Sequence, residues 1–150
     1  MGRTWSSPGL GLLLVVAGVA ALGSLPGPPV TLLAADKAVY TDALGTGWVN
    51  WSWDTTVTLA NPSPVHQGTA SIAVTYTSAW AGLFLHTDTA LSGGDYQSLR
   101  FAIHGGSAGG QHLCVVLYDG SGAAGTPVTL PPPQAGAWTE VPVSMADLGS

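Results

Sequence analysis

The stretch GWVNWSWD, residues 47–54, contains half of the chain's six tryptophans. Alternate side chains of an extended strand point to the same face. We therefore expect Trp51 and Trp53 on one face and Trp48 on the opposite face. Two indoles on one face form either a block of hydrophobic core or a flat platform at the surface, and the sequence leaves both possibilities open.

Short segments in which apolar and polar residues alternate predict β-strands on the carboxyl-terminal side of this stretch. The clearest are TTVTLA, SIAVTY, LRFAIH and WTEVPV, at residues 55–60, 71–76, 99–104 and 138–143. Further strands are expected at residues 38–44, 80–86, 113–118 and 128–130. About eight short strands separated by Gly, Pro and Asn turns are typical of an antiparallel β-sandwich or jelly roll. The predicted fold class is therefore all-β.

The single cysteine, Cys114, lies in the segment LCVVLY, residues 113–118, which is apolar throughout. Such a segment predicts a strand that is covered on both faces. The thiol is therefore expected to be buried and unreactive. With one cysteine, the domain has no internal disulfide.

The amino-terminal residues 1–35 have the pattern of a secretory signal peptide and leader. Arg3 supplies a positive charge, residues 10–22 are almost uniformly apolar, and small residues at Gly23, Ala34 and Ala35 offer cleavage sites. The apolar run is shorter than the roughly 20 residues that a membrane span needs. We expect a secreted, extracellular protein whose mature form, residues 36–150, has no membrane anchor.

Charge limits the partners of the mature domain. Charged residues make up 7% of the chain, and its formal net charge is −5. After residue 35 the cations are Lys37 and Arg100. An acidic surface repels phosphate backbones, so nucleic acid is disfavoured as a partner and a neutral ligand is favoured.

Residues 39–149 resemble the jelly-roll domains of secreted bacterial proteins, related to carbohydrate-binding modules of the galactose-binding-like type. The segments that carry the resemblance are VYTDAL, GWVNWSWD, PVHQGTASIAVTY, AWAGLFLH, SLRFAIHGG, GGQHLCVVL and AWTEVPVSMADLG. The resemblance implies a non-catalytic module that binds a polysaccharide or oligosaccharide and is covalently linked to a further domain. Such domains continue with one or two more strands, so it also implies that residues 36–150 lack the last strand or strands. Asp42 is similar in position to a structural calcium ligand of these domains.

Carbohydrate-binding modules stack aromatic rings on the apolar faces of sugars, while nearby polar groups bind hydroxyls. Trp51 and Trp53 are candidates for such a platform, and Trp80 extends it. The polar candidates are His86, Arg100 and His104, which lie with the ring of Phe84 on the outward faces of two predicted strands. These faces form one surface if the two strands are neighbours. The alternative is that the tryptophans are core and the histidines ordinary surface residues.

Catalysis by this segment is not expected. Glycoside hydrolysis uses two carboxylates across a cleft, yet Glu140 is the only glutamate, and no GxSxG motif occurs. The four histidines show no zinc-ligand spacing, so no cofactor is expected apart from the possible calcium at Asp42. Two other functions remain open: a structural or adhesive surface module without sugar binding, and the accessory domain of a glycoside hydrolase whose catalytic part lies beyond residue 150.

Overall fold

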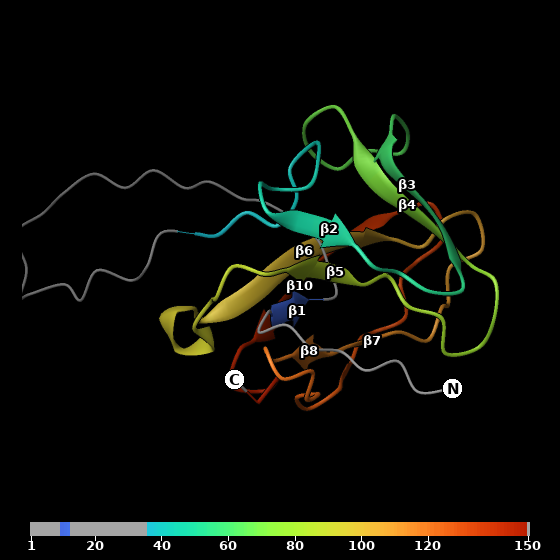
Figure 1. Cartoon of the computed structure of the whole chain (residues 1–150). Coiled ribbons are helices and arrows are strands. Elements are labelled where there is room, and N and C mark those ends of the chain that lie inside the picture. Colours follow the sequence, from blue (N-terminus) through green and yellow to red (C-terminus); the bar gives the residue numbers. More distant parts are fainter. Residues whose placement is uncertain (1–9, 13–35, 150) are drawn as a thin grey trace, which may run out of the picture.

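The computed structural model describes residues 10–12 and 36–149, and within them the chain is built from short β-strands (Figure 1). In chain order the elements are β1 Leu10–Leu12, β2 Trp48–Asn50, β3 Thr55–Asn61, β4 Ser71–Tyr76, β5 Leu85–Thr87, the 3₁₀ helix η1 Gly93–Asp95, β6 Ser98–His104, β7 Cys114–Val115, β8 Leu117–Tyr118, β9 Val128–Thr129 and β10 Trp138–Ser144. Every pairing between these strands is antiparallel. The described residues contain no α-helix, which confirms the predicted β-rich, antiparallel class. None of their helices is long and apolar enough to cross a membrane.

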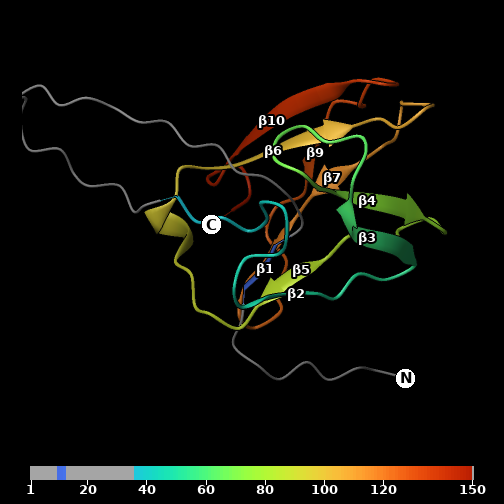
Figure 2. The ribbon, with the colours of Figure 1, turned by 90° about the horizontal axis from the view of Figure 1, so that it is seen from above.

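The strands form one sheet of four strands and three two-stranded ribbons. The sheet has the order β2-β5-β1-β8, and the ribbons are β6–β10, β3–β4 and β7–β9. Seen from above, the β6–β10 ribbon lies on one side of the molecule and β1, β2 and β5 lie on the other, with β3 and β4 beside them (Figure 2). The core lies between these two groups of strands.

Alternating residues of β6 and β10 supply one side of this core. Phe101 is opposite Val141, and Leu99 is opposite Val143, so their side chains share a face. They belong to one cluster with Trp48, Leu85, Leu117 and other buried side chains of the remaining strands. Each fully buried large apolar side chain stabilises the fold by about 1.5–3 kcal/mol.

The four strands with the clearest alternation form as predicted. Along β3, half-buried and exposed residues alternate at every position, and β4, β6 and β10 agree with the predicted ranges to within a residue or so. In β3 the alternation places Val57 against the core cluster while its threonine neighbours face solvent. Period-two alternation was therefore a sufficient signal for these elements.

The strand predicted at residues 38–44 is wrong. The backbone N–H of Thr41 donates to the carbonyl of Ala43 at 3.1 Å, and Tyr40 and Leu44 form an isolated bridge, so the segment turns back on itself. Tyr40 is 2% exposed, and its hydroxyl donates to the carbonyl of Leu59 at 2.7 Å. The apolar residue Tyr40 is therefore an anchored side chain within a turn and not part of a strand.

The predictions for residues 80–86 and 113–118 need correction as well. The first strand begins only at Leu85, because the preceding residues follow a loop with Trp80 at a positive φ of 64°. The second divides into β7, paired with β9, and β8, paired with β1. Cys114 is exposed, so the predicted buried thiol is wrong.

The predicted signal peptide covers residues 1–35, and all of these except 10–12 lie outside the described residues. The described part is β1, which lies between β5 and β8 with Gly11 opposite both His86 and Tyr118. Removal of a leader at any of the predicted sites would take β1 out of the sheet. The facing edges of β5 and β8 would then be unpaired.

Candidate functional site

The three tryptophans of residues 47–54 divide between core and surface. Trp48 is 5% exposed and belongs to the core cluster, whereas Trp51 and Trp53 are 39% and 44% exposed. Both of the latter rings contact Phe84, so the expected division between opposite faces is confirmed. The open choice between core block and surface rings is thereby decided for Trp51 and Trp53, which lie at the surface.

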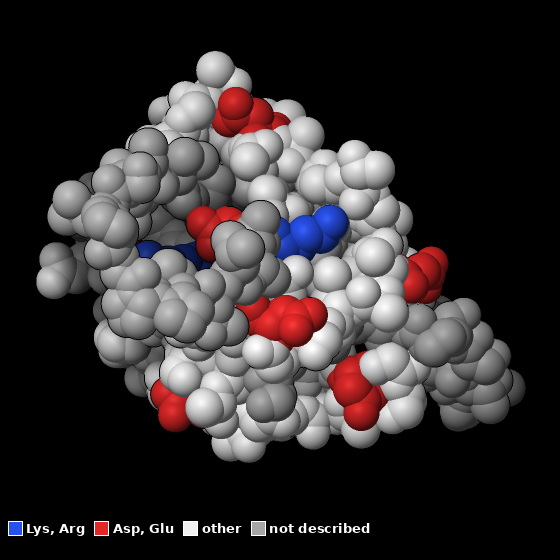
Figure 3. All heavy atoms as spheres, turned by 90° about the vertical axis from the view of Figure 1, so that its left-hand side faces the viewer, with Lys and Arg blue, Asp and Glu red and all other residues white. Residues whose placement is uncertain are grey.

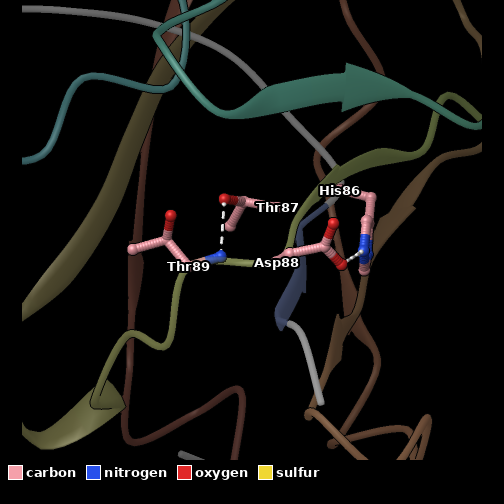
Figure 4. Close-up of polar contacts among 4 residues, drawn as sticks. All are labelled: His86, Thr87, Asp88 and Thr89. Carbon is pink, nitrogen blue, oxygen red and sulfur yellow. Dashed lines mark hydrogen bonds and ion pairs between the residues drawn. The ribbon is translucent and has the colours of Figure 1, made fainter. Parts of the chain in front are cut away.

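Trp51 lies flat on His86. Their ring centroids are 3.7 Å apart and their planes differ by 10°, and the backbone N–H of Trp51 donates to the carbonyl of Phe84 at 2.8 Å. The imidazole of His86 is buried, and its Nε2–H donates to Oδ1 of Asp88 at 3.0 Å (Figure 4). The indole therefore rests on a ring that is itself fixed in orientation.

Figure 4 also shows how the end of β5 is held. The backbone N–H of Thr89 donates to Oγ1 of Thr87 at 3.2 Å, a local turn that follows the strand directly. Thr87 is 1% exposed. This turn keeps the Asp88 carboxylate beside His86.

Trp53 is fixed by the loop that precedes β5. Its backbone N–H donates to the carbonyl of Gly82 and its carbonyl accepts the N–H of Gly82, both at 3.1 Å. Its indole Nε1–H donates to the carbonyl of Trp80 at 2.8 Å. The indole lies against Gly82, where a side chain would collide with the ring. The ring of Trp53 can therefore take this orientation only because residue 82 is a glycine.

Trp80 is the most exposed of the large apolar side chains, at 93%. Its positive φ is unusual for a bulky residue and costs free energy, of the order of 1–3 kcal/mol for a strained residue. The loop that carries it is attached to Asp54, whose carbonyl accepts from the N–H and the hydroxyl of Thr77 at 2.9 and 2.8 Å. The fold therefore holds this indole out into solvent.

Phe84 contacts four other aromatic rings: Trp51, Trp53, His86 and Tyr118. Its centroid lies 6.4 Å from Trp51, 6.0 Å from Trp53 and 6.3 Å from His86, and it meets Tyr118 edge-on at 5.5 Å. We define the aromatic surface as the exposed rings Trp51 and Trp53 with Phe84 and His86, which contact them, together with the exposed ring of Trp80, whose backbone carbonyl accepts from Trp53. The sequence did not indicate the supporting roles of Tyr118 and Gly82, because both depend on contacts between distant segments.

The predicted group of polar residues does not come together. β6, which carries Arg100 and His104, pairs with β10, whereas the neighbours of β5, which carries His86, are β2 and β1. The two strands are therefore not neighbours, and their outward faces do not merge. Arg100 is exposed, and its Nε–H donates to Oγ of Ser98 at 3.3 Å.

His104 instead lines a groove on the outer face of the β6–β10 ribbon. This groove has a volume of about 430 Å³, and its other walls come from β4 and from the loop at residues 62–70. Trp138, opposite His104 in the ribbon, has its ring centroid 5.2 Å from His104 and 5.5 Å from His66 of the loop. The sequence analysis missed Trp138 and His66, because the register of β10 against β6 was not known.

The loop at residues 62–70 is held to the rest of the domain by Asp42. One carboxylate oxygen of Asp42 accepts from the backbone N–H groups of Thr69 at 2.7 Å and Ala70 at 3.0 Å. These hydrogen bonds lower the pKa of Asp42, and burial, with a smaller effect from this carboxylate, raises the pKa of Tyr40. The calcium expected at Asp42 stays a prediction; within the described residues its oxygen has a structural role.

Among residues 10–12 and 36–149, no three His, Cys, Asp or Glu side chains are grouped in a way that could hold a metal ion. On the face drawn in Figure 3, the acidic side chains are scattered over an otherwise uncharged surface and the basic atoms cover a small area. The described residues on this face therefore offer no concentrated charge for an ionic ligand.

Comparisons with known proteins give no relative. No family model, no curated protein and no solved structure matches the chain. The function must therefore be argued from the residues themselves.

Proposed function

We propose that this chain is a non-catalytic carbohydrate-binding module whose aromatic surface stacks on a neutral polysaccharide. The observation that carries the proposal is that two exposed indoles, Trp51 and Trp53, lie on the supporting rings of His86 and Phe84, and that the loop bonded to Trp53 carries a third exposed indole, Trp80. Scattered exposed apolar residues are normal, but a group of them favours a binding site. The exposed fractions of Trp51, Trp53 and Trp80 are 39%, 44% and 93%.

Rigidity supports the same proposal. Trp51 is stacked on His86, and Trp53 is held by its bond to the carbonyl of Trp80. Rings that are fixed before binding lose little conformational entropy when a ligand arrives, which favours affinity. Indoles are also well suited to the apolar faces of sugar rings, since they offer a large flat surface with one polar group.

A polar group for hydroxyls lies next to these rings. Asp88 is exposed and binds the imidazole on which Trp51 rests. The Asp88 carboxylate accepts hydrogen bonds from hydroxyls, whereas the amide oxygen of Asn50 already accepts from the backbone N–H and the hydroxyl of Ser52. The low charge of the chain suits an uncharged glycan better than a polyanion.

The proposal includes a jelly-roll architecture and secretion. Buried side chains from the β6–β10 ribbon and from the β2-β5-β1-β8 sheet form one cluster, as expected for two layers of a sandwich. Because β1 belongs to the predicted leader, we propose that another strand of a longer protein takes the place between β5 and β8 after cleavage. Such a protein would join the module to a further domain.

The test is affinity electrophoresis of the full chain in gels that contain neutral soluble polysaccharides, such as xyloglucan, glucomannan or β-glucan. Trp51→Ala and Trp53→Ala should each weaken retardation about tenfold or more, since a stacked ring contributes roughly 0.5–1.5 kcal/mol beyond its buried area. Val49→Ala is the matched control, because Val49 is equally exposed, at 44%, but has no ring.

Two outcomes would reject the proposal. If the folded wild-type chain binds none of the polysaccharides, a structural or adhesive surface module becomes the better account. If it binds and the tryptophan variants bind equally well, the aromatic surface is not the site. Circular dichroism of each variant separates these outcomes from loss of folding.

A further inference from the structure

The groove on the outer face of the β6–β10 ribbon is separate from the aromatic surface. None of Trp51, Trp53 and Trp80 lines it, whereas Trp138, His104 and the loop at residues 62–70 do. Its volume of about 430 Å³ lies within the range of about 300–1,000 Å³ that is usual for small-ligand pockets. The groove therefore has its own walls and a size suited to a small molecule.

The walls of the groove are fixed before any ligand binds. Asp42 holds one end of the loop through Thr69 and Ala70. At its other end, the hydroxyl of Ser71 donates to the carbonyl of Pro64 at 2.8 Å, and the amide of Asn61 donates to the carbonyl of Ser63 at 2.9 Å. A preformed groove binds with a smaller entropic cost than one that must be assembled.

Its floor is apolar and its mouth is polar. The floor contains Ala102, Ile72 and Val74. At the mouth, Nδ1 of His104 accepts the backbone N–H of Gly106 at 3.0 Å, so the neutral imidazole carries its proton on Nε2 and can donate it. Gln67, exposed on the loop, adds an amide.

The charges near the groove exclude an anionic ligand. Within the described residues, its lining contains no Lys or Arg, and Glu140 lies beside it, with Oε1 3.9 Å from Nε2 of His66. A cation is also a poor fit, because the Asp42 carboxylate already accepts two backbone hydrogen bonds and the Glu140 side chain is 77% exposed. An uncharged molecule with one apolar face and several hydroxyls fits this combination.

We propose that this groove is a second carbohydrate site, which binds a neutral mono- or disaccharide against Trp138 while Nε2 of His104 and Gln67 bind its hydroxyls. This inference rests on the proposed function, because it assigns a second subsite to the same glycan-binding module. The aromatic surface would hold the length of a polysaccharide, and the groove would take a chain end or a short branch.

Isothermal titration of the full chain with maltose, cellobiose, lactose and mannobiose tests this inference. At least one disaccharide should bind, and Trp138→Ala should weaken it about tenfold or more. Ala102→Leu, which fills the groove from its floor, should have the same effect and leaves the indole in place. Val49→Ala, whose exposed side chain belongs neither to the groove nor to the aromatic surface, should retain disaccharide binding within about twofold.

The outcomes separate the two proposals. Disaccharide binding that survives both Trp138→Ala and Ala102→Leu would overturn the groove assignment. Binding of polysaccharide without any disaccharide would overturn it too and leave the aromatic surface as the module's site. A folded chain that binds neither class would reject both proposals, and circular dichroism shows whether each variant is folded.

Discussion

The indole of Trp53 lies against Gly82, and a Cβ built at residue 82 would be under 3.0 Å from three carbons of the ring. Gly82 is not among the glycines with positive φ, so glycine is needed here for space and not for its backbone conformation. Gly82→Ala should therefore displace Trp53 and leave the strands in place. We expect about tenfold weaker polysaccharide binding, the loss that one misplaced stacked ring would give, measured by affinity electrophoresis.

Gly94→Ala is the matched control for this substitution. A Cβ at residue 94 would meet only Oγ of Ser92, at 3.8 Å, which is an ordinary contact. This variant should bind like the wild type. Equal binding by Gly82→Ala would show that the position of Trp53 does not matter to the ligand.

Trp48 should affect folding and not binding. It is 5% exposed and packs in the core cluster, so Trp48→Ala leaves a cavity that costs about 3–5 kcal/mol of folding free energy. Trp51→Ala removes a ring that is 39% exposed and should cost clearly less. Urea unfolding followed by circular dichroism measures both, and equal losses for the two variants would contradict the division between core and surface.

Part of the fold was predictable because β3, β4, β6 and β10 are long enough for period-two alternation to be visible. Residues 38–44 were predicted as a strand, yet they form a turn, since the hydrogen bond from Tyr40 to Leu59 and the acceptor role of Asp42 depend on distant segments. Local pattern does not report such long-range contacts. The pairing of the strands was unpredictable for the same reason.

The candidate site divides in a similar way. Strand geometry predicted Trp48 on one face of residues 47–54 and Trp51 and Trp53 on the other; their exposure agrees with this, although β2 ends at Asn50 and both exposed rings follow it. The grouping of His86 with Arg100 and His104 failed, because it required β5 and β6 to be neighbours. Trp138 became visible as a candidate only when its register opposite His104 was known.

Asp42 should make stability depend on pH in the acidic range. Its folded-state pKa lies below the ordinary value of 3.8, because the carboxylate accepts the N–H groups of Thr69 and Ala70. The resulting stabilisation is fully present above the ordinary pKa and is lost as the pH falls through the folded-state pKa. Asp42→Asn lacks this charge and should lose less stability on acidification.

Urea midpoints of the wild type and Asp42→Asn at pH 7 and pH 3 check this expectation. The wild type should be the more stable at pH 7, and the difference should narrow at pH 3. Asp119, whose pKa is lowered by the hydroxyl of Ser121 and nearby backbone N–H groups, is present in both proteins and cancels from the comparison. A difference that is the same at both pH values would contradict the role given to the Asp42 charge.

Cys114 should react in the folded protein. It is exposed on β7, whereas the next residue, Val115, is 1% exposed and packs in the core. An exposed thiol titrates with Ellman's reagent in native buffer, while a buried one reacts only after unfolding. We expect one equivalent to react without urea, none in Cys114→Ser, and disulfide-linked pairs of chains on gels after mild oxidation. A thiol that becomes reactive only in urea would show that the apolar segment at residues 113–118 is covered on both faces after all.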